Sequence, residues 1–291
     1  MSERPEMPAV LSRLLDLLDL ERIEVNLFRG QVQDLGWGTL FGGHVLSQAL
    51  HAAALTVPED RPIHSLHSYF LRRGDVTTPV IYDVDRIRDG KSFTTRRVVA
   101  IQNGRPIFNL SASFQIDEPG FSHQAEMPEA KGPDGLQSTR ELALEWAADM
   151  PARVRDRVAY ERPIEIRPVW PLNPRKPDPR PARKQIWMRA VGPLPDTPAV
   201  HRYLLAYASD FELLGTSVLP HGVSGLTAGM QMASLDHAMW FHRPFRMDEW
   251  LLYVIESPSA SGARGLGRGQ FFTRAGELVA STAQEGLIRQ R

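Results

Sequence analysis

The feature of this sequence that most constrains its fold is an internal similarity between its two halves. The segment HSYFLRRGD at residues 67–75 resembles HAMWFHRPF at residues 237–245, at an offset of 170 residues. Further along, VIYDVDRI (80–87) is similar to WLLYVIES (250–257), and RRVVAIQNGRPIFNLSASFQI is similar to GLGRGQFFTRAGELVASTAQEGLI. Self-similarity of this length indicates duplication. A chain of 291 residues is long enough to hold two such copies.

One copy of the repeat combines a helix with long antiparallel strands. The helix, from about Gly43 to Val57, is rich in alanine, so a sheet can pack closely around it. The segments that follow alternate between apolar and polar residues with a period of two, as half-buried strands do. RDG at 88–90 and NG at 103–104 are hairpin turn signals between these strands. The first half is therefore predicted to be a helix followed by an antiparallel meander.

The second copy is expected after a proline-rich segment. Residues 118–183 are dense in proline and carry one short helical pattern at 139–150, so we predict an extended linker there. The pattern of VHRYLLAYASDFELLG (200–215) then predicts the second helix. We therefore predict an α+β double hotdog, in which two fused copies of a central helix are each wrapped by a curved antiparallel sheet. The expected division is an N-terminal repeat at 1–117, the linker, and a C-terminal repeat at 184–291, with the two sheets joined edge to edge.

Composition excludes several classes of protein. Lys+Arg and Asp+Glu both total 34, so the net charge is zero and no electrostatic footprint for nucleic acid is present. The chain has no cysteine, which excludes disulfides, thiolate metal sites and a cysteine nucleophile. His64 and His67 lack further ligand residues, so neither a metal nor a cofactor is expected. No stretch approaches the ~18 consecutive apolar residues of a membrane span, and the first residues lack a signal core, so we expect a cytoplasmic protein with no membrane partner.

The polar stretch ASLDHAMWFHRPF at residues 233–245 does not fit a compressed catalytic triad. Side chains alternate along a strand, so Ser234 and Asp236 point away from His237. No G-x-S-x-G elbow surrounds any serine of the chain. Ser234 by itself is also typical of a small, hydrogen-bonded strand residue. His237 and His242 are expected to be structural, packing with the neighbouring aromatic side chains.

Two other polar residues are predicted to face the interior. Asp210 flanks an apolar stripe of the predicted second helix, which consists of Leu204, Tyr207, Phe211 and Leu214. A carboxylate beside a buried face needs polar partners, because burying it unpaired is costly. A solvent-facing position on an amphipathic helix would also explain Asp210. Strand alternation places Gln284 inward with Thr282 and turns Glu285 toward solvent.

Several blocks, in order and over nearly the whole chain, resemble the bacterial acyl-CoA thioesterase II (TesB-type) family. They include LFGGHVLSQAL, HSLHSYFLRRGD, IYDVDRIRDGKSF, SLDHAMWFHRPF and VASTAQEG. The resemblance implies a double hotdog in which an Asp, a Ser or Thr, and a Gln hold the water that attacks a thioester. These residues correspond to Asp210, Ser234 and Gln284. One departure is His44, where many relatives have glutamine, and this change is expected to alter substrate fit or the local pH response.

By this resemblance the chain is a cofactor-free acyl-CoA thioesterase that hydrolyses medium- to long-chain acyl-CoA to free fatty acid and CoA. Backbone N–H groups near Gly42 and Gly43, at a helix start, would stabilise the oxyanion. The CoA phosphates would meet surface arginines, for which the candidates are Arg243, Arg264 and Arg268. The alternatives are a hotdog enoyl-CoA hydratase or dehydratase, which would need a histidine such as His201 close to Asp210, and a non-catalytic acyl-CoA-binding protein. A homo-oligomer, dimer or tetramer, is also expected.

Overall fold

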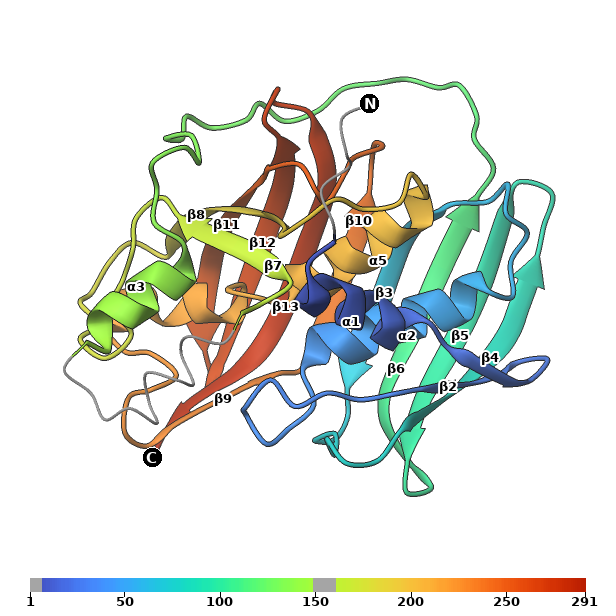
Figure 1. Cartoon of the computed structure of the whole chain (residues 1–291), viewed down its shortest axis with the longest axis horizontal. Coiled ribbons are helices and arrows are strands. Elements are labelled where there is room, and N and C mark those ends of the chain that lie inside the picture. Colours follow the sequence, from blue (N-terminus) through green and yellow to red (C-terminus); the bar gives the residue numbers. More distant parts are fainter. Residues whose placement is uncertain (1–6, 149–160) are drawn as a thin grey trace.

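The fold is described from a computed structural model, for residues 7–148 and 161–291. In each half a central helix is wrapped by antiparallel strands (Figure 1), which confirms the predicted double hotdog. The first half contains α1 (Ala9–Leu18), β1 (Glu21–Glu24), β2 (Leu27–Gly30), α2 (Gly42–Ala54), β3 (Ile63–Phe70), β4 (Val80–Asp89), β5 (Phe93–Gln102) and β6 (Arg105–Gln115). It is followed by α3 (Thr139–Trp146), β7 (Ile164–Pro168), β8 (Arg183–Ala190), α5 (Pro198–Ser209), the 3₁₀ helix η1 (Leu214–His221), β9 (Met230–Ser234), β10 (Asp236–Phe241), β11 (Leu251–Ser261), β12 (Arg264–Thr273) and β13 (Leu278–Gln290).

One continuous antiparallel sheet runs through both halves of the described chain. Its strand order is β1-β2-β4-β5-β6-β3-β10-β13-β12-β11-β8-β7, and β9 pairs with β13 beside this path. The halves join at β3 and β10, where Ser68 lies opposite His237. The Ser68 hydroxyl also donates a hydrogen bond to the His237 carbonyl oxygen at 2.8 Å. The predicted edge-to-edge junction is confirmed, and it removes two sheet edges from solvent.

The repeat is confirmed, but its predicted offset of 170 residues is wrong by one at the central strands. His67 is exposed on β3, whereas His237 on β10 is completely buried. Neighbouring strand positions face opposite sides of a sheet, so these two histidines cannot be equivalent. The buried residue that matches His237 is Leu66, 171 positions earlier in the chain. The prediction aligned the two strands on their histidines, His67 and His237, and this alignment is shifted by one residue.

The helices of the two halves pack against each other and share one hydrophobic core, to which strands of both halves contribute. The Ser47 hydroxyl on α2 donates to the Tyr203 carbonyl oxygen on α5 at 2.7 Å. The rings of His51 and Tyr203 lie 4.6 Å apart between centroids. At the other end of the contact, Gly43 approaches the Tyr207 carbonyl so closely that a Cβ atom would collide with it. The start of α2 therefore meets the end of α5.

The helix predicted for residues 200–215 is shorter than expected and ends at Ser209. Asp210 is its C-cap residue, and Glu212 follows with φ +67°, a left-handed conformation that a right-handed helix cannot continue through. The Lys184 ammonium donates to the Glu212 carboxylate at 2.5 Å and holds this turn. Tertiary contacts therefore end the helix where its apolar periodicity would let it continue.

The glycines of β12 make room for η1. A Cβ atom on Gly265 would collide with Ser217 of η1, and a Cβ atom on Gly267 would lie 3.0 Å from the Leu213 carbonyl oxygen. Side chains at these positions would push η1 off the sheet. The glycines thus allow the connection between α5 and β9 to pack directly on the strands.

The segment predicted as a linker, residues 118–183, contributes more than a linker. It contains α3 within the predicted helical pattern, and β7, in which Ile164 lies opposite Ala190 of β8. Residues 149 and 150 of that pattern lie outside the described chain. The extended part between β6 and α3 (Figure 1) packs over a cluster of apolar side chains, and the Trp187 indole donates to the Lys131 carbonyl oxygen at 2.8 Å. The division of the chain at residue 184 stays a prediction.

Candidate active site

Asp210 lies where the two halves of the molecule touch. Its position as the C-cap of α5 places it against the first residue of α2, Gly42. A Cβ atom on Gly42 would come within 2.6 Å of Asp210 Oδ2 and 2.9 Å of the Phe70 ring. Only glycine permits this approach of backbone to carboxylate. The start of α2, the positive end of its macrodipole, thus faces the Asp210 side chain.

Ser234 ends β9, immediately before Leu235 separates this strand from β10. Its hydroxyl donates a hydrogen bond to Asp210 Oδ1 at 3.3 Å. The break between the strands is held by Asp236, whose Oδ1 accepts a hydrogen bond from the Glu285 backbone N–H at 2.6 Å. Asp236 therefore fixes the backbone next to Gln284 and does not contact Asp210 itself.

Gln284 faces the interior from β13 and is completely buried, as strand alternation predicts. Its Nε2 donates to Asp210 Oδ1 at 2.6 Å and to His237 Nδ1 at 3.1 Å. Its Oε1 is buried and has no hydrogen-bond partner among the described residues. Glu285 points to the other face, where Arg264 Nε donates to it at 3.0 Å. The structure thus brings Asp210, Ser234 and Gln284 together around one carboxylate oxygen.

His237 occupies a different environment from the one expected. It was expected to pack with the neighbouring aromatic side chains, but it contacts the polar cluster, formed by Asp210, Ser234 and Gln284, through Nδ1 and Ser209 through Nε2. Nδ1 accepts from Gln284, and Nε2 lies 2.9 Å from the Ser209 hydroxyl. Burial lowers the pKa of His237 to about 4, against the opposing attraction of the Asp210 carboxylate. This contact could be anticipated only from the pairing of β10 with β13. Ala238 lies opposite Ala283, and His237 and Gln284 are the next residues along the two strands.

His44 does not contact the polar cluster. It is buried in α2, and its Nε2 lies 3.0 Å from the Gln31 carbonyl oxygen. Burial lowers the pKa of His44 to about 4, although the hydrogen bond to Gln31 acts in the opposite direction. At neutral pH the ring is uncharged, and His44 is a buried part of the core of the first half.

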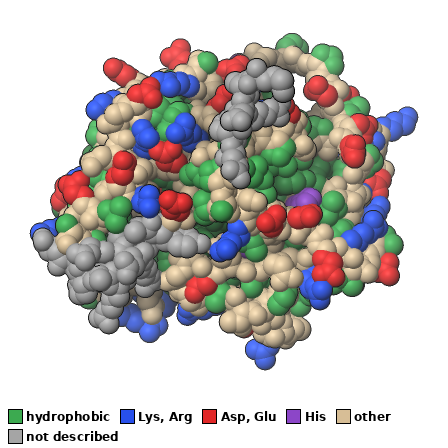
Figure 2. All heavy atoms as spheres, viewed as in Figure 1, with side chains coloured by type: hydrophobic (Ala, Val, Ile, Leu, Met, Phe, Trp, Pro, Cys, Tyr) green, Lys and Arg blue, Asp and Glu red, His purple; other side chains and the backbone are tan. Residues whose placement is uncertain are grey.

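The three arginines expected to meet CoA phosphates all have partners within the protein. Arg264 binds Glu285, and Arg268 donates to Glu256 at 2.7 Å. Arg243 donates to the Leu278 carbonyl oxygen at 2.9 Å and so supports the backbone of β13. Figure 2 shows acidic and basic side chains intermixed over one face of the molecule, around a hollow in which hydrophobic side chains gather.

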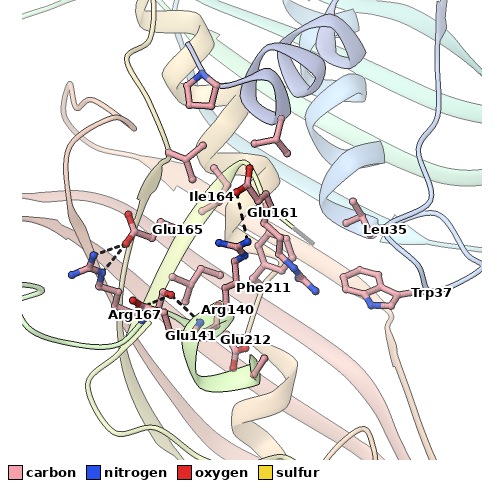
Figure 3. Close-up of a pocket in the computed structure, with 18 of the residues that line it drawn as sticks. Leu35, Trp37, Arg140, Glu141, Glu161, Ile164, Glu165, Arg167, Phe211 and Glu212 are labelled. Atoms are coloured by element: carbon pink, nitrogen blue, oxygen red, sulfur yellow. Dashed lines mark hydrogen bonds and ion pairs between the residues drawn. The ribbon is translucent and has the colours of Figure 1, made fainter. Parts of the chain in front are cut away.

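A cavity of about 1020 Å³ is lined by Phe211 and Glu212, the two residues that follow Asp210, whereas Asp210, Ser234 and Gln284 are not among its described lining residues. Leu35, Trp37 and Phe211 line one side of it, and Phe211 directly follows Asp210 in the chain (Figure 3). Two ion pairs also line it, Arg140 with Glu161 at 3.6 Å and Arg167 with Glu165 at 2.7 Å (Figure 3). Two further arginines also line the cavity: Arg162 and Arg175.

Aromatic side chains connect this cavity to the start of α2. Phe41 stacks on Phe211 with ring centroids 4.5 Å apart and meets Trp37 edge-on at 5.5 Å. A second cavity, of about 800 Å³, shares Ile166 and Glu212 with the first. Its apolar lining includes Leu142, Trp146, Ile166, Ile186, Val218 and Leu219. The polar cluster thus lies near space suitable for a partly polar and partly apolar ligand.

Among the described residues, no group of three or more His, Asp and Glu side chains is arranged to hold a metal ion. Within the same ranges, none of the helices is long and apolar enough to cross a membrane.

The fold and the cluster together define a double hotdog protein with a carboxylate, a carboxamide and a hydroxyl at the helix contact. Residues 153–287 match the family model described as "Acyl-CoA thioesterase", and residues 32–115 match "Acyl-CoA thioesterase N-terminal domain". The chain is 43% identical to "Acyl-CoA thioesterase 2" of Haemophilus influenzae, over 97% of this chain and 99% of that protein. It is 41% identical to the human "Acyl-coenzyme A thioesterase 8", over 99% of this chain and 92% of that protein.

A solved structure agrees with these sequence matches. The crystal structure of the acyl-CoA thioesterase II TesB2 from Mycobacterium marinum superposes with a TM-score of 0.77 at 43% identity, covering 96% of this chain and 98% of that one. The chain therefore belongs to the acyl-CoA thioesterase family and is a thioester hydrolase.

Proposed function

We propose that the protein hydrolyses medium- to long-chain acyl-CoA to a free fatty acid and CoA, using a water molecule held by Asp210, Ser234 and Gln284. The observation that carries this proposal is the convergence of Ser234 and Gln284 on Asp210 Oδ1, together with the unpaired, buried Gln284 Oε1. A carboxylate and a carbonyl oxygen in one site can accept both hydrogens of a water molecule. The water oxygen then has its lone pairs available for attack.

In this mechanism Asp210 is the general base. The water oxygen bonds to the thioester carbon while one of its protons passes to Asp210, a contribution of about 10²–10⁴ in rate. The tetrahedral intermediate collapses with cleavage of the C–S bond. Asp210 then returns the proton to the departing thiolate, which leaves as the thiol of CoA. Gln284 and Ser234 orient the water and the carboxylate, respectively. Backbone N–H groups at the start of α2, near Gly42, would stabilise the oxyanion.

The two cavities suit the two parts of such a substrate. Arg162 and Arg175 line the larger cavity, where a phosphate-bearing CoA moiety would find positive charge. The apolar lining of the smaller cavity suits a medium- to long-chain acyl group. We assign the CoA phosphates to these arginines instead of Arg243, Arg264 and Arg268, which are already engaged.

The alternative expected from the sequence within the same fold was a hydratase, which would use a histidine close to Asp210. The surroundings of His237 and His201 disfavour it. Both ring nitrogens of His237 are used inside the protein, and the ring is completely buried. His201 accepts from the Met247 backbone N–H at 3.0 Å, near the opposite end of α5 from Asp210.

The decisive experiment is to incubate the protein with acyl-CoAs of graded chain length and follow free thiol. A hydrolase releases thiol, and we expect the rate to be greatest for medium to long chains. A hydratase would consume enoyl absorbance without thiol release, and a binding protein would do neither. Either of these last two results would reject the proposed function.

We further propose that the protein acts in the cytoplasm as a homo-oligomer, a dimer or tetramer. The support for assembly is the exposure of large apolar side chains on the outer sheet face, including Tyr69 at 58% and Phe93 at 43%. Light scattering should then give two or four times the chain mass of 32.7 kDa. A monomer mass at micromolar concentration would reject the assembly, and recovery outside the cytoplasmic fraction would reject the location.

A further inference from the structure

We propose that His237 is a positioning residue for the reaction, which holds the Gln284 carboxamide with its carbonyl oxygen turned toward the attacking water. This inference rests on the proposed function of the Asp210 site. His237 itself would touch neither water nor substrate. Its effect comes from the single hydrogen-bonding pattern that its ring permits.

The hydrogen bond to Ser209 fixes which ring nitrogen carries the proton. The Ser209 hydroxyl donates to the Ala206 carbonyl oxygen at 2.9 Å, so its only hydrogen is already used. The same hydroxyl lies 2.9 Å from His237 Nε2 and can only accept there. Nε2 must therefore carry the hydrogen, and Nδ1 of the neutral ring is left as an acceptor.

The hydrogen bonds of Gln284 require the same tautomer independently. Both Asp210 Oδ1 and His237 Nδ1 face the same Gln284 nitrogen, at 2.6 Å and 3.1 Å. An ionised carboxylate can only accept, so the group facing it must be the NH₂ and not the carbonyl. The second NH₂ hydrogen then goes to Nδ1. Rotating the carboxamide by 180° would place Oε1 against two acceptors, so His237 and Asp210 together exclude that orientation.

The consequence is that Gln284 Oε1 forms a hydrogen bond with neither Asp210 nor His237. It is buried, and the described residues give it no hydrogen-bond partner. A buried carbonyl without a partner is costly, and such a cost is typical of a group reserved for a ligand. A water donating one hydrogen to Oε1 and one to Asp210 would satisfy it. The inference therefore links the His237 tautomer to the direction of the attacking water.

The first half of the molecule shows that packing alone does not require a histidine here. Leu66 lies opposite Ala112 in the β3–β6 ladder, and it corresponds to His237, which contacts Gln284 one residue beyond the Ala238–Ala283 pair of β10 and β13. Both Leu66 and Ala112 are buried. An apolar pair therefore satisfies this position when no catalytic carboxamide has to be oriented.

Two substitutions separate positioning from packing. His237→Asn retains a side-chain acceptor at the place of Nδ1, whereas His237→Gln places its amide near Nε2 and leaves Gln284 without that acceptor. With thiol release as the readout, we expect His237→Asn to keep kcat within about tenfold of the native enzyme. We expect His237→Gln to lose about 10²-fold in kcat with KM changed less than about threefold, because an orienting contact is lost and not a binding contact.

The inference fails if His237→Gln is as active as His237→Asn, or if both match the native enzyme. Asp210→Asn is measured alongside, because its full activity would reject the proposed site itself and not the role of His237. A measurement on the native protein covers the case in which neither variant folds. With ¹⁵N-labelled histidine, the His237 ring should show a protonated Nε2 and an unprotonated Nδ1 at neutral pH, and a protonated Nδ1 would overturn the proposal.

Discussion

The two halves of this molecule share a fold but differ in what they place between helix and sheet. At corresponding positions, the first half has Leu66 opposite Ala112, and the second has His237 hydrogen-bonded to Gln284, one residue beyond the Ala238–Ala283 pair. At the helix ends, the C-cap is Leu55 in α2 and Asp210 in α5. The polar cluster is thus built by one half only. Duplication allows this, because the apolar half can supply core packing while the other half carries costly buried polar groups.

The connections after the two helices differ in the same way. Residues 55–62 lead directly from α2 into β3, whereas residues 210–229 contain Asp210, the left-handed turn at Glu212 and η1 before β9 begins. The glycines of β12 make space for this longer connection. The first half nevertheless contributes to the site, since Gly42 at the start of α2 faces the Asp210 carboxylate. The site therefore needs both halves, each for a different reason.

After substitution of Asp210, the largest effect on activity is expected for Gly42→Ala, which tests whether the first half contributes to the site. The added Cβ atom would lie 2.6 Å from Asp210 Oδ2 and 2.9 Å from Phe70, so the carboxylate must move. A displacement of this order should lower kcat/KM by about 10²-fold. The matched control is Gly132→Ala, whose Cβ atom would meet nothing within 4 Å. Equal activity of the two variants would show that the first half contributes no part of the site.

A smaller effect is expected at Ser234, which donates the longer of the two hydrogen bonds to Asp210 Oδ1. Ser234→Ala should lower kcat by about tenfold, because one hydrogen bond to a charged group is lost and Gln284 remains. Ser234→Thr should retain most of the activity, since the hydroxyl is kept. Complete loss of activity in the threonine variant would point to serine as a nucleophile.

The smallest effect concerns the pH dependence of stability, and it compares one buried histidine from each half. Burial lowers the pKa of His44 and of His237 to about 4, while an unfolded histidine titrates near 6.5. Between these values the unfolded chain binds more protons, so the free energy of unfolding falls as the pH is lowered, by about 1.4 kcal/mol per pH unit for each histidine. Above pH 6.5 the contribution is fully present.

His44→Gln should remove one of these two contributions, because glutamine can donate to the Gln31 carbonyl oxygen without titrating. Chemical denaturation measured from about pH 6.5 down to about pH 4 should therefore show a shallower slope in this variant. His123→Gln, at an exposed position, is the control. If the slopes of both variants match that of the native protein, the burial of a neutral His44 is not what makes folding sensitive to acid.

The sequence predicted the helix-and-meander unit and the inward direction of Gln284, because these depend on periodicity within short segments. It also predicted the duplication, from the similarity of the two halves, and from that the edge-to-edge sheet. It did not predict the end of α5, because that end depends on a left-handed turn held by Lys184, from a strand distant in sequence. The contacts of His237 could not be predicted from the sequence either. They depend on pairing between β10 and β13 and on a hydroxyl from α5, which no single segment encodes. Asp210 and Ser234 were identified by resemblance, and the structure brings them within hydrogen-bonding distance.

The central claim is that Asp210 activates the water that cleaves the thioester. It is tested most directly by measuring thiol release at saturating acyl-CoA for Asp210→Asn, beside Asp83→Asn, an exposed aspartate of the first half. We expect kcat of Asp210→Asn to fall by about 10²–10⁴, with a melting temperature close to that of the native protein and with Asp83→Asn fully active. Native turnover in a correctly folded Asp210→Asn variant would contradict the account.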